Sequence, residues 1–182
     1  MKNSVIALIL GILTCAAAQS QVAPSAGSDG RIQNQVEINR LLAPIKSAQD
    51  LYDYLNKKPP ESPLDKLSPS AKRRFVDSLQ FNEKGLTTFQ YTDLESELST
   101  SEIYQVLALF GVQHHAASIR GARVSSATDL LIKNSLLVCD PSFAAQGIRA
   151  ATTGICIDYP DYQCIKRGTC ESAGGKICTS NC

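Results

Sequence analysis

The segment Ser99–Gly111, STSEIYQVLALFG, contains the clearest helix signals in this 182-residue chain. Ser99 and Glu102 form a capping-box pattern, in which two side chains satisfy backbone N–H groups that a helix start leaves unpaired. Apolar residues follow at i, i+3, i+4 and i+7: Ile103, Val106, Leu107 and Phe110. Gly111 suits the position just past a helix end. The segment therefore predicts an amphipathic helix with one buried face.

Two further segments combine a serine cap with helical apolar spacing. Ser47 precedes a stripe made of Ala48, Leu51, Tyr52 and Leu55. Ser68-Pro69 precedes a stripe made of Phe75, Val76 and Leu79, and proline suits the first helical position. We expect these helices to stop at Pro59-Pro60 and at Gly85.

The remaining helical signals are weaker. Ser126 caps a run that continues through two leucine-rich clusters, 130–132 and 136–138, and this run forms either one buried helix or a helix followed by a short strand. Shorter helices are expected at about 34–43 and 113–120.

The N-terminus has the pattern of an export signal. Lys2 supplies the positive charge, and residues 4–14 form an uncharged apolar run that is too short for a membrane span of about 20 residues. Ala16-Ala17-Ala18 offers a cleavage site after Ala18, and Ala18-Gln19-Ser20 offers a second. We therefore expect an exported protein, periplasmic or extracellular.

Cys15 supports an alternative, in which the chain is a lipid-anchored envelope component. A lipoprotein signal places small residues before the modified cysteine, and Leu13 and Thr14 fit that pattern poorly. We therefore expect Cys15 to be removed with the signal.

Charge disfavours two classes of partner. The formal net charge is +1, and Lys2 is the one charged residue of the signal, so the processed chain is neutral. Nucleic acids and anionic membranes attract an excess of positive charge. We expect neither as the main partner.

Six cysteines crowd the C-terminal segment 139–182: Cys139, Cys156, Cys164, Cys170, Cys178 and Cys182. An even number behind an export signal indicates disulfide bonds. We expect Cys178 and Cys182 to pair with other cysteines rather than with each other. Structural zinc is disfavoured, because the spacing contains no C-x2-C pair.

These observations predict a mainly α fold. We expect a signal peptide at 1–18, a flexible leader at 19–33, a small helical bundle-like domain at 34–138 and a disulfide-stapled segment at 139–182. That last segment is expected to have little regular structure, apart from a short β-hairpin in which 155–157 and 176–179 form the strands.

Catalytic motifs are missing from the sequence: it has no G-x-S-x-G, H-E-x-x-H, Walker loop or G-x-G-x-x-G. His114-His115 contains every histidine, and we expect a partly exposed pair, with a pH-sensitive contact or a ligand role as the alternative. The acids Asp93, Glu95 and Glu97 are expected to form a solvated face. A carboxylate pair is the alternative.

Charge is also divided within the helical part. Segment 57–74 is mainly basic and segment 75–102 is mainly acidic. We expect these segments to be solvated or to meet each other in the fold, and the alternative is a polar docking surface.

The leading functional hypothesis is a non-enzymatic binding protein, with inhibitors and secreted effectors as special cases. Its contact residues would be Tyr159, Tyr162, Lys166 and Arg167, because disulfide-rigidified loops that display aromatics and arginine bind with little ordering cost. The partner would be an unknown protein or cell-envelope component. The alternative is a small exported hydrolase that uses carboxylates or the histidines. No metal or cofactor is predicted.

Overall fold

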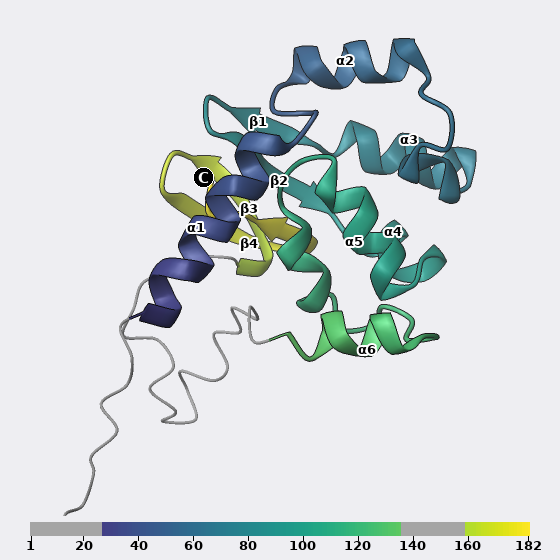
Figure 1. Cartoon of the computed structure of the whole chain (residues 1–182). Helices are drawn as coiled ribbons and strands as arrows, with labels where there is room; N and C mark the ends of the chain where they lie inside the picture. Colours follow the sequence, from purple (N-terminus) through teal and green to yellow (C-terminus); the bar gives the residue numbers. More distant parts are fainter. Residues whose placement is uncertain (1–26, 136–158) are drawn as a thin grey trace, which may run out of the picture.

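The computed structural model describes residues 27–135 and 159–182 (Figure 1). The predicted signal, Cys15, Cys139, Cys156 and the strand expected at 155–157 lie outside the described residues. The helices are α1 (Gly27–Leu42), α2 (Ala48–Lys57), α3 (Pro69–Asp77), α4 (Thr92–Glu97), α5 (Thr100–Ala108) and α6 (Ala127–Lys133), with 3-10 helices η1 (Pro63–Lys66) and η2 (Gln113–Ala117). The strands are β1 (Gln80–Asn82), β2 (Gly85–Gln90), β3 (Tyr159–Lys166) and β4 (Thr169–Cys178).

All four described strands form one antiparallel sheet in the order β1-β2-β4-β3. The prediction of a mainly α fold is therefore wrong, because this sheet shares the core with the helices. The helix predicted after Ser68 was expected to continue until Gly85. Instead α3 ends at Asp77, and Gly85, with φ +125°, opens β2 after the tight β1–β2 turn.

β2 escaped detection because its sequence lacks the alternation that marks a half-buried strand. Its residues from Gly85 to Phe89 are all buried, since the strand lies between β1 and β4 and under the helices. A strand covered in this way has no polar solvent face to reveal its period of two. Thr87 and Thr88 are buried but form hydrogen bonds through their hydroxyls.

One apolar core joins the helices to the sheet. Phe75 of α3 makes edge-to-face contacts with Phe89 of β2 and with Phe110, at ring-centroid distances of 6.4 and 6.1 Å. Ile103 of α5 and Ile177 of β4 are also fully buried in this core. Figure 1 shows α3, α4 and α5 gathered beside the strands, with α2 at the top and α6 at the bottom.

The helix starts follow the predicted capping chemistry. The hydroxyls of Ser47, Ser68, Ser99 and Ser126 each accept a hydrogen bond from the backbone N–H three residues on. Ser99 and Glu102 form the complete capping box. The helices predicted after Ser47, Ser68 and Ser99 are confirmed, and α2 ends at Lys57, just before Pro59-Pro60 as expected.

Two other expectations are refined. α1 begins at Gly27, within the stretch predicted as a leader, and its end passes over Gly111. The helix expected at 113–120 is the shorter 3-10 helix η2. The run after Ser126 forms α6, and its second cluster, 136–138, lies outside the described residues.

The C-terminal hairpin is confirmed, but it is longer than predicted and folds back on itself. Segment 176–178 lies in β4 as expected, whereas its partner strand is β3. Cys170 and Cys178 both belong to β4, and an extended strand would place their Cα atoms roughly 26 Å apart. The observed distance is 6.2 Å. The hairpin tip therefore curls back over the base, near positive-φ Asp161 and Gly175.

Candidate functional site

The four predicted contact residues lie together on β3 and the turn that follows it. Tyr159 and Tyr162 are each a little over one-third exposed, and their rings are tilted with centroids 5.6 Å apart. Lys166 ends β3 and Arg167 begins the turn, and both are exposed. The Arg167 guanidinium lies 3.4 Å from the Glu83 carboxylate of the β1–β2 turn. This exposed ion pair contributes little stability.

A break in the pleat brings the two tyrosines together. In a regular strand, residues three apart point to opposite faces of the sheet. Asp161 lies between them with φ 63°, and the β3–β4 register shifts between Pro160 and Tyr162. Such an irregularity redirects the side chains that follow it. It places both rings on one face, which spacing alone does not reveal.

Sequence reasoning missed the residues that hold this bend. The Asp161 carboxylate accepts from the Tyr91 hydroxyl at 2.8 Å and from the Gly175 N–H at 2.9 Å. The Tyr91 N–H in turn donates to the Gly175 carbonyl at 2.8 Å. Burial, with the bond to Asp161 adding to it, raises the pKa of Tyr91 to about 12. The Tyr91 hydroxyl is therefore protonated at neutral pH and can donate this hydrogen bond.

Two disulfides fix the hairpin. Cys164 is bonded to Cys182 and Cys170 is bonded to Cys178, so the predicted disulfide bonds are confirmed for these four residues. The first bridge ties β3 to the C-terminal end, where the Gly168 N–H also donates to the Cys182 carbonyl at 2.7 Å. The second bridge ties the tip of β4 to its base. Each bridge contributes about 2–4 kcal/mol by restricting the unfolded chain.

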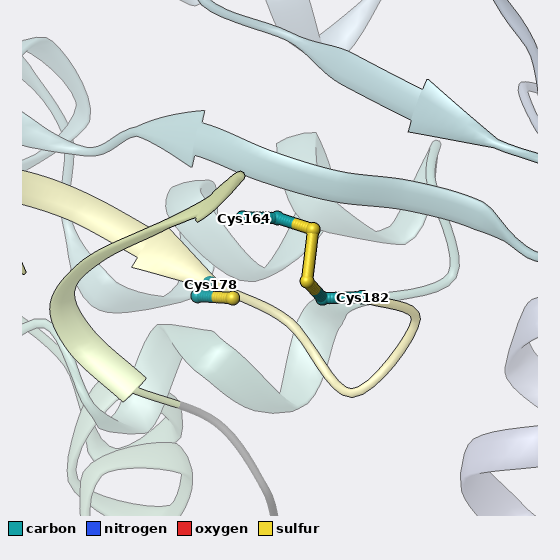
Figure 2. A group of neighbouring side chains, drawn as sticks. All are labelled: Cys164, Cys178 and Cys182. Carbon is teal, nitrogen blue, oxygen red and sulfur yellow. A yellow bond between two sulfur atoms is a disulfide. The ribbon is translucent and has the colours of Figure 1, made fainter. Parts of the chain in front are cut away.

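The two bridges lie against each other. Figure 2 shows Cys178 beside the Cys164–Cys182 bridge, and the Sγ atoms of these three residues all lie within 4.8 Å of one another. Three thiolates at such distances would suit a thiophilic cation. In this oxidised chain each of these sulfurs is already bonded to another sulfur, which removes the thiolate that a metal needs.

The acidic run on α4 is not a solvated face, so that prediction is wrong. Asp93 forms an ion pair with Arg74 at 2.5 Å, and Glu95 accepts from the Gly121 N–H at 2.8 Å. Glu97 accepts from both the N–H and the hydroxyl of Ser68, each at 2.7 Å. These carboxylates bind three different parts of the fold, an arrangement that does not favour a catalytic pair.

The basic and acidic segments meet, as one of the expectations held. Arg74 of the basic segment pairs with Asp93 of the acidic segment, and Lys66 lies 3.4 Å from Glu102. The opposite charges therefore stabilise the packing of η1 and α3 against α4 and α5. Both lysine and arginine remain partly exposed, which keeps each contribution small.

The histidine pair is buried, so the expectation of a partly exposed pair is wrong. His114 and His115 belong to η2 and are 8% and 1% exposed. Their rings lie 4.3 Å apart, and His115 packs edge-to-face against Phe89 at 5.7 Å. The pair is part of the packing between η2 and β2.

Asp129 is a second residue whose role the sequence did not reveal. Its buried carboxylate accepts from the backbone N–H of Ser125 at 2.9 Å and of Ser101 at 2.6 Å. It also accepts from the Ser126 hydroxyl at 2.8 Å. These hydrogen bonds, with the Ser125 N–H first among them, hold the pKa of Asp129 well below its usual range. Asp129 thus joins α6 to the start of α5.

None of the helices within 27–135 and 159–182 has the length and apolarity required to cross a membrane. No family model, curated protein or solved structure matches the chain.

Proposed function

We propose that this protein is an exported, non-enzymatic binding protein whose contact surface is the outer face of the curled hairpin. The observation that carries this proposal is the paired Tyr159 and Tyr162 rings on a hairpin secured by two disulfides. Tyrosine and arginine are enriched among the residues that dominate binding energy. The bend held by Asp161 presents the rings before any partner arrives, which lowers the ordering cost of association.

Neighbouring residues extend the surface. Ile165 of β3 is 47% exposed and adds an apolar element that sequence reasoning missed. Lys166 and Arg167 lie next to it and supply positive charge at the hairpin tip. A mixed surface of aromatic, aliphatic and cationic groups suits a protein partner, or a cell-envelope component with both apolar and anionic groups.

The disulfide bonds and the environments of the acidic and histidine side chains support this proposal. Disulfides persist in oxidising surroundings, which is compatible with the export signal predicted at 1–18. The hydrolase alternative has less support, since the α4 carboxylates are engaged in the fold and the histidines pack in the core. We place the protein in the periplasm or outside the cell.

The test compares two surface variants of the full chain. Tyr162→Ala combined with Arg167→Ala removes an aromatic and a cation from the hairpin, and Tyr52→Ala on α2 is the control, since Tyr52 is 63% exposed and far along the chain from the hairpin. Each protein is cross-linked in its native compartment, and the attached partners are quantified by mass spectrometry. We expect the hairpin variant to lose at least 10-fold in partner recovery, the equivalent of about 1.4 kcal/mol.

The control is expected to recover partners as the wild type does, and all three chains should unfold at similar temperatures. Equal recovery by the hairpin variant and the wild type would refute the proposed surface. A loss seen equally with Tyr52→Ala would place the contact elsewhere on the molecule.

A further inference from the structure

We propose that the two adjacent bridges form a thiol-reactive site, at which an external thiolate triggers a relay that exchanges the pairing to Cys164–Cys170 and Cys178–Cys182. The inference rests on the arrangement of four sulfurs and does not depend on the proposed binding function. Its ligand class is a thiol, either small or displayed by a protein.

The geometry that permits the exchange comes from the curled hairpin. Cys164 and Cys170 are directly opposite each other in the β3–β4 register, yet each is bonded to a residue nearer the chain end. The fold-back brings Cys178 Sγ within 4.8 Å of the sulfurs of the neighbouring bridge. Both partners of the exchanged pairing are therefore close already: one across the hairpin, the other across the turn in which the Cys182 N–H donates to the Thr179 carbonyl.

Exposure and polarity indicate where a thiol attacks. Cys178 and Cys182 are buried, whereas Cys164 and Cys170 are partly exposed. Cys182 Sγ lies 3.3 Å from the Lys166 carbonyl oxygen and 3.5 Å from that of Thr169, whereas Cys164 Sγ lies 3.6 Å from the Lys166 oxygen. Negative charge released on Cys182 would face these oxygens, so attack on Cys164 is disfavoured. The first attack therefore falls on Cys170.

The relay is balanced in three steps. The external thiolate attacks Cys170 Sγ, the Cys170–Cys178 bond breaks, and Cys178 leaves as a thiolate. Cys178 then attacks Cys182 Sγ, which forms Cys178–Cys182 and releases the Cys164 thiolate. Cys164 finally attacks the mixed disulfide at Cys170, forms Cys164–Cys170 and regenerates the external thiolate. These four cysteines form two disulfides before and after, so the thiol acts as a catalyst and no net oxidant or reductant is needed.

The exchange would change which parts of the C-terminal hairpin are covalently joined. In the native pairing, the bridges hold the hairpin tip to its base and to the C-terminal end. In the exchanged pairing, one bridge lies within the hairpin tip and the other within the last residues of the chain. The tip is then no longer covalently tied to the base. The hairpin would therefore have a rigid state with the native pairing and a less constrained state with the exchanged pairing.

The test uses the oxidised wild-type chain and reduced glutathione in substoichiometric amount. After an acid quench, cleavage after Arg149, Lys166, Arg167 and Lys176 separates the three peptides that hold these four cysteines: 150–166, which also carries Cys156, 168–176 and 177–182. Native bridges join all three in one species. We expect glutathione to release peptide 177–182 with an internal disulfide, while the other two peptides stay joined as the main early product.

The matched control is Cys170→Ser combined with Cys178→Ser, which removes the point of attack and keeps the Cys164–Cys182 bridge. Its bridge is expected to persist under the same conditions. Conversion of the wild type only to peptides with free thiols would overturn the proposal. The proposal would also be overturned if the variant lost its Cys164–Cys182 bridge as fast as the wild type loses the species in which all three peptides are joined.

Discussion

At the scale of single residues, carboxylates that accept several hydrogen bonds connect the elements of this protein. Asp129, Asp161 and Glu97 each accept several hydrogen bonds, and at least one of these comes from a residue distant in sequence. A carboxylate has enough lone pairs to satisfy two or three donors at once, and hydrogen bonds to a charged group are stronger than neutral ones. Acidic residues that look like surface features in the sequence therefore act as connectors between elements.

Asp129→Asn tests this role, with Asp50→Asn as the matched control. Both aspartates follow a serine cap by three residues, and in both the hydrogen bonds lower the pKa, but Asp129 also binds Ser101 on another helix. We expect Asp129→Asn to lower the urea midpoint clearly more than Asp50→Asn does. Equal shifts of the urea midpoint would show that the hydrogen bond between α6 and α5 does not stabilise the fold.

The same residue predicts a pH dependence. Its pKa is lower in the folded chain than in the unfolded chain, where an aspartate titrates near about 3.9. As the pH falls below that value, the unfolded chain takes up the proton first, so this contribution to stability is present above about pH 4 and lost in more acidic solution. Urea unfolding between pH 2 and 6 should show a shallower acid loss in Asp129→Asn than in the wild type; parallel curves would contradict the assignment.

At the scale of elements, close backbone approaches decide how helices meet. Gly111 follows α5 with φ +73°, and a Cβ there would lie 2.7 Å from the Arg40 Cα and 2.8 Å from the Asn39 carbonyl of α1. Among the α1 side chains that the structure describes, the large apolar residues Ile38, Leu41 and Leu42 are exposed. The position of α1 is thus tied to a glycine that sequence analysis assigned only to a helix stop.

A pair of glycine variants separates backbone strain from this contact. Gly168 has φ +72°, nearly the same as Gly111, but a Cβ there would meet no atom of the described structure within 4 Å. We expect Gly168→Ala to cost about 1–2 kcal/mol from its left-handed conformation alone. Gly111→Ala should cost more, because α1 must also move. Equal losses in urea unfolding would show that the approach of α1 is not required.

At the scale of the whole molecule, the C-terminal hairpin completes a sheet that begins far earlier in the chain. β4 pairs with β2 through Thr88–Cys178, Phe89–Ile177 and Gln90–Lys176. The tail is therefore joined to the sheet: the base of the hairpin belongs to the core, and the tip curls back over that base, where the Cys170–Cys178 disulfide holds it. Core packing and disulfides stabilise different parts of the same hairpin.

Removal of one bridge should reveal this division. Cys170→Ser with Cys178→Ser is expected to cost about 2–4 kcal/mol. Amide exchange should accelerate at the tip, around Gly168, while the N–H groups of Phe89 and Ile103 in the core keep their relative protection. Uniform loss of protection in all three places would indicate that tip and base unfold as one unit.

What the sequence determined by itself is local. The serine caps, the capping box at Ser99, the three amphipathic helices and the disulfide character of the tail all follow from groups only a few residues apart, or from composition. Tertiary structure alone decided the rest: that 80–90 forms a hairpin, that β4 joins β2, and that Tyr159 and Tyr162 share a face. These features depend on pairing between distant segments and on burial from both sides, which erases the periodic signal that a lone strand would show.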